Sequence, residues 1–204
     1  MGGSLTDAQR VALDALAPLI AKDFYLGGGV AIALRLSHRL SRDLDFFAAE
    51  SDPVDFEERL VQLAGVRVTG RASGTLHLEV QGVPVSLLRY RYPMLHDPES
   101  DPRVPVRLAS MDDLVCMKLS AIGGRGARRD FWDLHELLVA LGLPLDEALA
   151  LFTRKFPAVD RGHIVRALSY FADADAEPMP VELTPPVWEA IKSDFTGWVV
   201  SLKV

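Results

Sequence analysis

The feature that most limits how this chain can fold is the stretch from Phe24 to Phe47, FYLGGGVAIALRLSHRLSRDLDFF. A short apolar segment ends at three consecutive glycines, and apolar residues with helical spacing then follow from Val30 to Leu36. After a basic turn, the stretch ends in an Asp-Leu-Asp-Phe-Phe segment. This order predicts a strand, a glycine turn, a helix and a second strand.

The glycines and the Asp-x-Asp pair together suggest a ligand site. Glycines permit backbone conformations that other residues avoid, so a ligand can approach the main chain closely. A helix that begins just after them directs unpaired N–H groups toward this space, which suits a phosphate group. In a strand, Asp43 and Asp45 project from one face, roughly 7 Å apart at Cα. Two carboxylates in front of an anion site suit a magnesium-bound polyphosphate. Solvated carboxylates on an edge strand and a simple tight turn are the alternatives.

Composition sets the broad class. The chain has 204 residues, which is enough for one large domain or two small ones. A formal charge of -6 excludes a wholly basic nucleic-acid coat but permits a local basic patch. The single cysteine, Cys116, cannot form an internal disulfide and has the apolar neighbours of a core residue. No signal-peptide pattern or long apolar run is present, so we expect a cytoplasmic protein that does not bind a membrane.

Helix and strand patterns alternate in the first half, and helices follow in the second. This predicts an α/β (α+β) fold, with a small mixed-sheet core in residues 1–109 and a helical half in residues 110–204, the two forming a cleft. The first half is predicted to contain a helix from a capping box at Thr6 and Gln9 to about Lys22, and a second helix over 54–64. Its predicted strands cover 24–26, 43–47, 66–69, 75–80 and 83–90. A Gln81-Gly82 hairpin turn joins the last two strands. The predicted helices of the second half cover 111–122, 130–141, 145–156 and 161–171, followed by a loose acidic segment to Pro180 and a helix capped by Thr184.

A second group of charged residues occupies Met111 to Leu138, MDDLVCMKLSAIGGRGARRDFWDLHELL. Lys118 lies on an otherwise apolar helix, and Asp130 and Asp133 share one helical face because they are three residues apart. Three arginines surround the glycine turn that precedes them: Arg125, Arg128 and Arg129. Such a cluster can bind a triphosphate or an RNA backbone. The alternative is a helical corner whose surface arginines pair with aspartates.

The two stretches, in this order, resemble the AbiEii/AbiGii-type nucleotidyltransferases. These belong to the DNA polymerase β-like superfamily and include toxins of bacterial toxin–antitoxin systems. The resemblance implies that residues 1–109 form the nucleotidyltransferase core and that residues 110–204 form a helical domain completing the active-site cleft. It also implies transfer of a nucleotide from a nucleoside triphosphate to an acceptor, in particular the 3′ end of tRNA, and a cognate antitoxin as partner.

The resemblance implies a role for several individual residues. Gly28 and Gly29 correspond to the glycine–small-residue motif of the family, and Asp43 and Asp45 would hold Mg²⁺, with Mn²⁺ as an alternative. Asp130 would complete the polar site as the base for the acceptor hydroxyl. The implied catalytic residues are Asp43, Asp45, Lys118 and Asp130, and the residues expected to bind the nucleotide are Gly28, Gly29, Arg39, Lys118, Arg125 and Arg128.

The sequence departs from the family pattern at two positions. Val30 follows the glycines where the family has Ser or Thr, so one hydroxyl group is missing. The superfamily commonly carries a third carboxylate on a later strand, and the matching segment VPVSLLRY has Ser86 instead. Glu79 on the neighbouring strand is the candidate substitute. These departures keep two other functions open: a catalytically silent nucleotide- or RNA-binding relative, and a nucleotidyltransferase that acts on a small molecule or a protein.

Two further patterns in the sequence involve aromatic residues and histidines. Arg89 and Arg91 alternate with Tyr90 and Tyr92, which is typical either of a strand that binds single-stranded nucleic acid or of an ordinary edge strand. The histidines lack metal-ligand spacing and cysteine partners, so we expect no zinc site.

Overall fold

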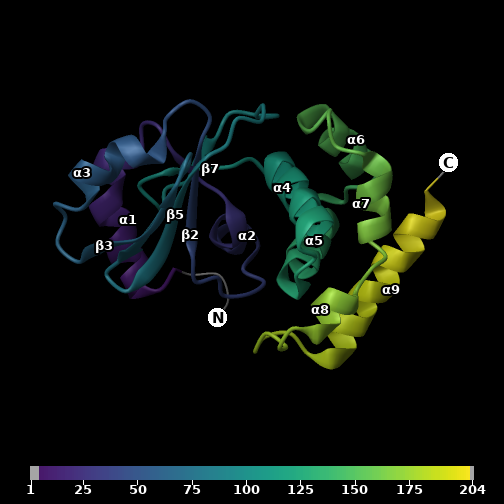
Figure 1. The fold of residues 1–204 in the computed structure, drawn as a ribbon. Helices are drawn as coiled ribbons and strands as arrows, with labels where there is room; N and C mark the ends of the chain where they lie inside the picture. The colour runs from purple at the N-terminus through teal and green to yellow at the C-terminus, as the bar shows by residue number, and fades with distance from the viewer. Residues whose placement is uncertain (1–4, 203–204) are drawn as a thin grey trace. The chain divides into compact units, whose positions relative to one another are not determined.

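A computed structural model describes residues 5–202 of the chain. These residues form two compact units, one up to Ser110 and the other from Met111 onward (Figure 1). The boundary inferred from composition falls one residue earlier, between residues 109 and 110.

Unit 1 is built around a mixed sheet with the strand order β3-β4-β5-β2-β1-β7-β6. Strand β2 pairs antiparallel with β1 and parallel with β5, and β1 pairs parallel with β7, so the predicted mixed sheet is confirmed. Its elements are α1 (Asp7–Ile20), β1 (Tyr25–Leu26), α2 (Gly28–Leu36), β2 (Leu44–Ala48), the 3₁₀ turn η1 (Pro53–Phe56), α3 (Glu57–Leu60), β3 (Val66–Ala72), β4 (Thr75–Val80), β5 (Val83–Arg89), β6 (Glu99–Ser100) and β7 (Arg107–Leu108).

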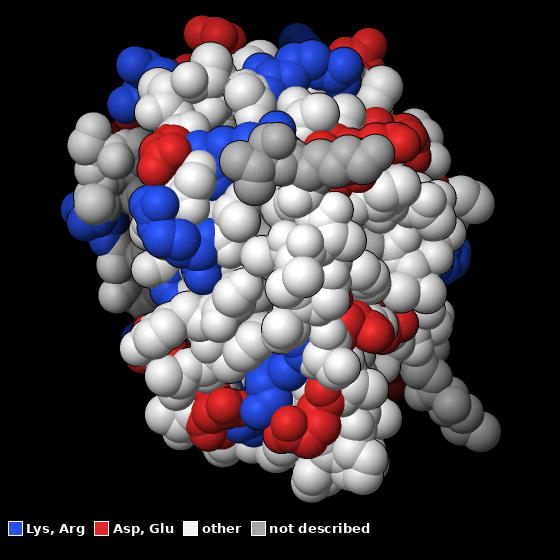
Figure 2. All heavy atoms as spheres, turned by 90° about the vertical axis from the view of Figure 1, so that its right-hand side faces the viewer, with Lys and Arg blue, Asp and Glu red and all other residues white. Residues whose placement is uncertain are grey.

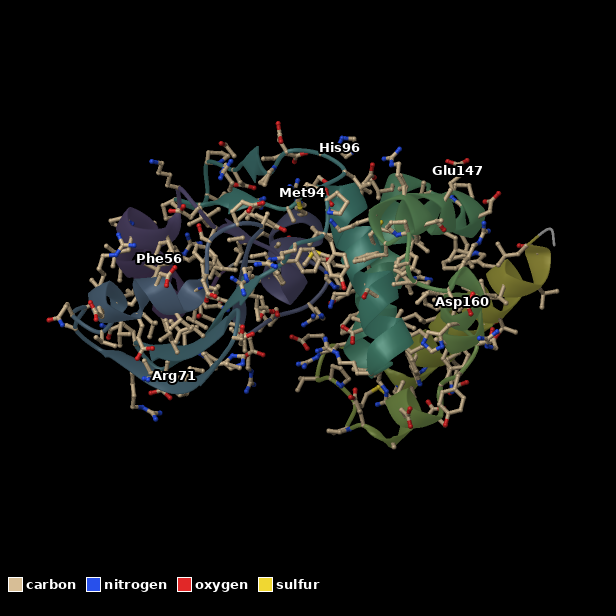
Figure 3. All side chains as sticks on the ribbon, turned by 45° about the horizontal axis from the view of Figure 1, so that its top comes forward. Phe56, Arg71, Met94, His96, Glu147 and Asp160 are labelled. Atoms are coloured by element: carbon tan, nitrogen blue, oxygen red, sulfur yellow. The ribbon has the colours of Figure 1, made fainter. Side chains whose placement is uncertain are left out.

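The core of unit 1 lies on one face of the sheet. In β4 and β5 every second side chain is buried, and the residues between them are half-buried or exposed. Helices α1 and α3 contact each other, and α1 contacts β5 (Figure 1). The ring of Phe56, labelled in Figure 3, packs edge-on against Phe24 at 5.2 Å between centroids. At the end of β3, Arg71 forms an ion pair with Glu57 of α3 (Figure 3). One face of the sheet is therefore closed by helices, and the other carries polar side chains.

Local sequence signals in unit 1 are confirmed where they depend on backbone chemistry. Thr6 and Gln9 form the predicted capping box of α1. Gln81 and Gly82 both have positive φ, at 52° and 79°, as the hairpin turn between β4 and β5 requires. The predicted helix over 54–64 is wrong in its length, because η1 and α3 end at Leu60. The short strands β6 and β7 were missed, since two residues carry no periodic pattern.

Unit 2 is helical. Helix α4 contacts α5, α6 and α7, and α5 contacts α8 and α9. The helices are α4 (Met111–Gly124), α5 (Arg128–Leu141), α6 (Leu145–Lys155), α7 (Arg161–Ala167), α8 (Ala172–Ala176) and α9 (Pro185–Ser201). The segment predicted to be loose before Pro180 contains α8. On α9, Trp188 is buried and its neighbour Val187 is exposed.

Two features hold the helices of unit 2 together. Phe131 of α5 packs against the rings of Phe171, Trp188 and Phe195, with centroids 5.1 to 6.1 Å apart. Lys155 of α6 forms a fully buried ion pair with Asp113 of α4, at 2.7 Å between Nζ and Oδ1.

No helix within residues 5–202 is both long and apolar enough to cross a membrane.

Candidate active site

The glycine turn brings the backbone of α2 against Asp45. The helix begins at Gly28, one residue before the end of the glycine run, so the expectation that it begins after all three glycines is corrected. Gly28 has φ 62°, and a Cβ atom placed on it would lie 2.6 Å from Asp45 Oδ2. The Gly27 N–H donates to the Asp45 carbonyl oxygen at 2.9 Å. The Asp45 carboxylate therefore occupies space that any side chain at position 28 would take.

The side chain of Arg39 lies against the next glycine, Gly29. A Cβ on Gly29 would be 2.6 Å from Arg39 Nη2 and 2.5 Å from Ser41 Oγ. Arg39 belongs to the loop between α2 and β2, is 8% exposed, and donates from Nη1 to the Leu40 carbonyl oxygen at 2.9 Å. The missing side chains of two glycines thus make room for a carboxylate and a guanidinium group beside the first turn of α2. The predicted contact of Arg39 with a nucleotide stays a prediction.

Asp43 and Asp45 follow the alternation expected of a strand. Asp43 precedes β2 directly, and Asp45 is its second residue. Both carboxylates are half-buried, whereas Leu44 and Phe46 have no exposed surface. Asp45 therefore projects from the face of β2 opposite Leu44 and Phe46 and reaches the glycine turn. Asp43 lies just outside the strand, so its place on the same face stays a prediction.

The neighbouring strands place Ser86 and His77 in the same row as Asp45. Asp45 pairs with Ser86 of β5, and Ser86 pairs with His77 of β4. His77 Nδ1 and Ser86 Oγ are 3.1 Å apart, within hydrogen-bond distance. Glu79, the candidate third carboxylate, instead pairs with Pro84 and forms an ion pair with Arg67 at 3.0 Å. The position beside Asp45 is thus held by a hydroxyl group.

This donor set suits one magnesium ion carried by a polyphosphate. Across residues 5–202, no three His, Cys, Asp or Glu side chains are grouped to hold a metal. Mg²⁺ is commonly bound through one or two carboxylates and completes its shell with water and substrate phosphates. Asp43 and Asp45 supply two carboxylates, and the Asp45 carboxylate lies against the glycine turn at the start of α2. The residues present fit such an ion.

In unit 2, Lys118 of α4 joins two aspartates of α5. Its Nζ lies 2.9 Å from Asp130 Oδ1 and 2.7 Å from Asp133 Oδ2. Arg125 donates to both oxygens of Asp130, at 2.7 Å from Nε and 2.8 Å from Nη2. Lys118 and both aspartates are buried, whereas the Arg125 side chain is 57% exposed. The sequence grouped these residues correctly, and the structure shows that they bind one another.

The environment of Asp130 favours its charged form. Burial raises the pKa of this carboxyl group, but the hydrogen bond from Arg125 and the charge of Lys118 outweigh it, so the pKa lies below the ordinary value of 3.8. A carboxylate with a lowered pKa is a weak proton acceptor. The role of Asp130 as a base stays a prediction, and its charge pairing weighs against it.

Arg128 is directed into unit 2. Its Nη2 donates to the Asp175 carbonyl oxygen at 3.1 Å, and its guanidinium carbon lies 5.3 Å from the ring centroid of Trp188. The side chain is 5% exposed. These contacts connect the start of α5 to α8 and α9, so they give Arg128 a structural role. Its predicted contact with a nucleotide stays a prediction.

Sequence reasoning missed the Ser86–His77 pair and the buried Lys155–Asp113 pair. The first depends on strand register, which the sequence of β4 or β5 does not reveal alone. The second joins residues on two helices with no shared motif. Cys116 is confirmed as a core residue, and burial raises the pKa of its thiol to about 12, so it is unreactive.

The fold is that of nucleotidyltransferases. The structure superimposes on MenT4, a nucleotidyltransferase toxin from Mycobacterium tuberculosis H37Rv, with a TM-score of 0.65 and 20% identity over 97% of this chain and 83% of that one. It also resembles the antibiotic-resistance factor ANT(2″)-Ia, with a TM-score of 0.57 and 17% identity over 73% of this chain and 92% of that one.

The sequence identifies the family. A family model described as nucleotidyl transferase AbiEii toxin, type IV TA system, matches residues 11–101 and 62–198. A protein of Aquifex aeolicus (strain VF5), named only as uncharacterized, is 36% identical over 195 residues, which are 94% of each chain. The chain belongs to the AbiEii nucleotidyltransferase toxin family, as its two motif blocks predicted.

Proposed function

We propose that this protein transfers a nucleotide from a nucleoside triphosphate to an RNA acceptor, with the 3′ end of tRNA as the expected acceptor. The observation that carries this proposal is the position of the Asp45 carboxylate in the space left by Gly28, at the start of α2. Family membership supports nucleotide transfer, and this geometry is what a metal-bound triphosphate needs. The reaction is attack of the acceptor hydroxyl oxygen on the α-phosphorus. The bond from that phosphorus to the bridging oxygen breaks, pyrophosphate leaves, and the hydroxyl proton is released.

The residues of unit 1 would bind and orient the triphosphate. Asp43 and Asp45 would hold Mg²⁺ or Mn²⁺, which when bound stabilises negative charge on the phosphoryl oxygens. The absence of side chains at Gly28 and Gly29 lets Asp45 and Arg39 lie against the first turn of α2, where the triphosphate would bind. The Arg39 guanidinium, held beside Gly29, would neutralise phosphate charge. Positioning of the triphosphate in this way supplies much of the rate enhancement expected for such transfers.

The proposal is tested with labelled triphosphates, Mg²⁺ and total tRNA. Asp43→Asn and Asp45→Asn should abolish covalent labelling, because an amide is a much weaker magnesium ligand than a carboxylate. Asp14→Asn, at an exposed position of α1, is the matched control and should label RNA like the wild type. Circular dichroism checks that each variant is folded. Full transfer by a folded Asp45→Asn protein would contradict the assignment.

A second candidate function is nucleotide or RNA binding without transfer. The observation that favours it is the pairing of Asp45 with Ser86, where the superfamily commonly has a carboxylate. In the same experiment a binding protein retains label on itself, and the label is released on denaturation without entering RNA. If labelled product forms but is not RNA, its mass identifies a small-molecule or protein acceptor.

The family description supports a proposal about the partner of this protein. The description names a type IV toxin–antitoxin system, so we propose a cognate antitoxin and a cytoplasmic site of action. Co-expression with the neighbouring gene products should relieve any growth arrest that the wild-type protein causes, and Asp45→Asn should cause none.

A further inference from the structure

A cleft of about 320 Å³ lies within unit 2, at the end of α4, and the established family membership assigns it no role. It is lined by residues from the end of α4, the turn after it, α7 and the segment leading into α8: Ile122, Gly123, Gly124, Arg125, Gly126, His163, Arg166, Ala167, Tyr170 and Asp173. Its volume is in the range of small-ligand sites. All its lining residues belong to one unit, so its shape is fixed by the packing of α4 against α7.

The packing of α4 against α7 leaves the cleft open. Gly123 allows close contact, because a Cβ on it would lie 2.5 Å from Ile164 Cδ1. His163 Nε2 lies 2.7 Å from the Gly123 carbonyl oxygen, and Asp160, labelled in Figure 3, caps the start of α7 through the N–H groups of Gly162 and His163. A Cβ on Gly124 would meet no atom within 4 Å, so this glycine borders empty space.

The side chains around the cleft are those that bind nucleotides. Tyr170 is 58% exposed and presents an aromatic ring. Arg166 is 72% exposed and pairs with Asp160 at 3.4 Å, a surface ion pair that costs little to exchange for a phosphate. Arg125, in the turn after α4, is also largely exposed, although its Nε and Nη2 donate to Asp130, so a phosphate would bind to the exposed part of an already paired guanidinium group. Asp173 adds a carboxylate that can accept hydrogen bonds from the amino group of a base.

We propose that this cleft binds one unpaired nucleotide of an RNA strand, with the base stacked on Tyr170 and the flanking phosphates on Arg125 and Arg166. Stacking of a base on an aromatic ring is tolerant of sequence, and arginines supply the contacts to the backbone. The two arginines come from separate elements, so they can contact phosphates on both sides of one base. On the face drawn in Figure 2, basic and acidic side chains are interspersed.

The inference rests on the proposed function only for the choice of RNA as the acceptor. It is tested by equilibrium binding of a labelled, unstructured RNA oligonucleotide to the full-length protein, with the matching duplex and a free nucleoside monophosphate as competitors. The wild type should prefer the single strand. Tyr170→Ala should weaken binding roughly 5- to 100-fold, and Tyr170→Phe should retain it because the ring is kept. Arg166→Ala should lower the slope of log affinity against log salt concentration by about one, because one phosphate contact is lost. Arg154→Ala on α6 should change neither the RNA affinity nor this slope.

Gly124→Val provides an independent test, because Gly124 lines the cleft and a Cβ on it would meet no atom within 4 Å, so the added side chain would narrow the cleft. It should weaken RNA binding as Tyr170→Ala does and leave the unfolding transition unchanged. Wild-type affinity in both Tyr170→Ala and Gly124→Val would overturn the inference, as would a wild type that binds no RNA or binds the free nucleotide equally well. A protein that binds RNA through this cleft but transfers no nucleotide would overturn the proposed function and leave the inference standing.

Discussion

Replacement of Gly28 by alanine tests the close approach of the α2 backbone to Asp45. Two costs follow from the structure. Gly28 has φ 62°, and a left-handed conformation costs a residue with a Cβ atom about 1–2 kcal/mol. The new Cβ would also lie 2.6 Å from Asp45 Oδ2, so the carboxylate must move, which costs about 0.5–1.5 kcal/mol more for a displaced rotamer. We expect Gly28→Ala to lower the free energy of unfolding by about 1.5–3.5 kcal/mol.

Two other glycines separate these costs. Gly82, in the hairpin turn of the same unit, has φ 79° and no atom within 4 Å of its Cβ position, so Gly82→Ala should show only the backbone cost. Gly29 has ordinary φ, but its Cβ would meet Arg39 and Ser41, so Gly29→Ala should show only the steric cost. Gly82→Ala therefore matches Gly28→Ala in backbone strain but leaves the carboxylate in place.

Urea denaturation measures the three stabilities, and calorimetric titration of a nucleoside triphosphate with Mg²⁺ measures the binding site. Gly28→Ala should weaken triphosphate binding at least about tenfold, equivalent to about 1.4 kcal/mol, because the displaced carboxylate no longer holds the metal in place. Gly82→Ala should bind like the wild type. Equal stability and equal binding in Gly28→Ala and Gly82→Ala would refute the reasoning that position 28 must be empty for Asp45 to act.

Three further predictions concern unit 2. Lys155→Met leaves the buried Asp113 carboxylate without its cation and should destabilise the protein by about 3–5 kcal/mol in a denaturation experiment. Adding Asp113→Asn to this variant should recover part of the lost stability. Full additivity of the two changes would argue against the pair. The folded pKa of Asp130 is lowered, so its contribution to stability is present above pH 3.8 and should be lost as the pH falls through the folded value. Asp130→Asn should therefore flatten the acidic part of the stability–pH profile measured by urea denaturation. Burial lowers the pKa of His135, but hydrogen bonds with Glu136 and Asp194 outweigh this effect and raise the pKa above 6.5. The contribution of His135 to stability is therefore complete below pH 6.5 and should be lost as the pH rises through the folded value. His135→Gln should remove that alkaline limb, and an unchanged pH profile would count against the His135–Asp194 contact.

The sequence by itself determined the elements that depend on local chemistry. The glycine run and the Asp-x-Asp strand were located correctly, because glycine conformation and strand alternation depend on neighbours in the chain. The capping box at Thr6 and the hairpin turn at Gln81 were predicted for the same reason. The order of the two motif blocks was enough to indicate the family.

Only the tertiary structure decided what lies beside each of these residues. Strand register placed Ser86 next to Asp45, and it placed Glu79 where it forms an ion pair with Arg67. Helix packing enclosed Arg128 against Trp188 and opened the cleft beside Tyr170. The physical reason is that register and helix packing are set by the summed burial of many distant side chains, to which a single motif contributes little.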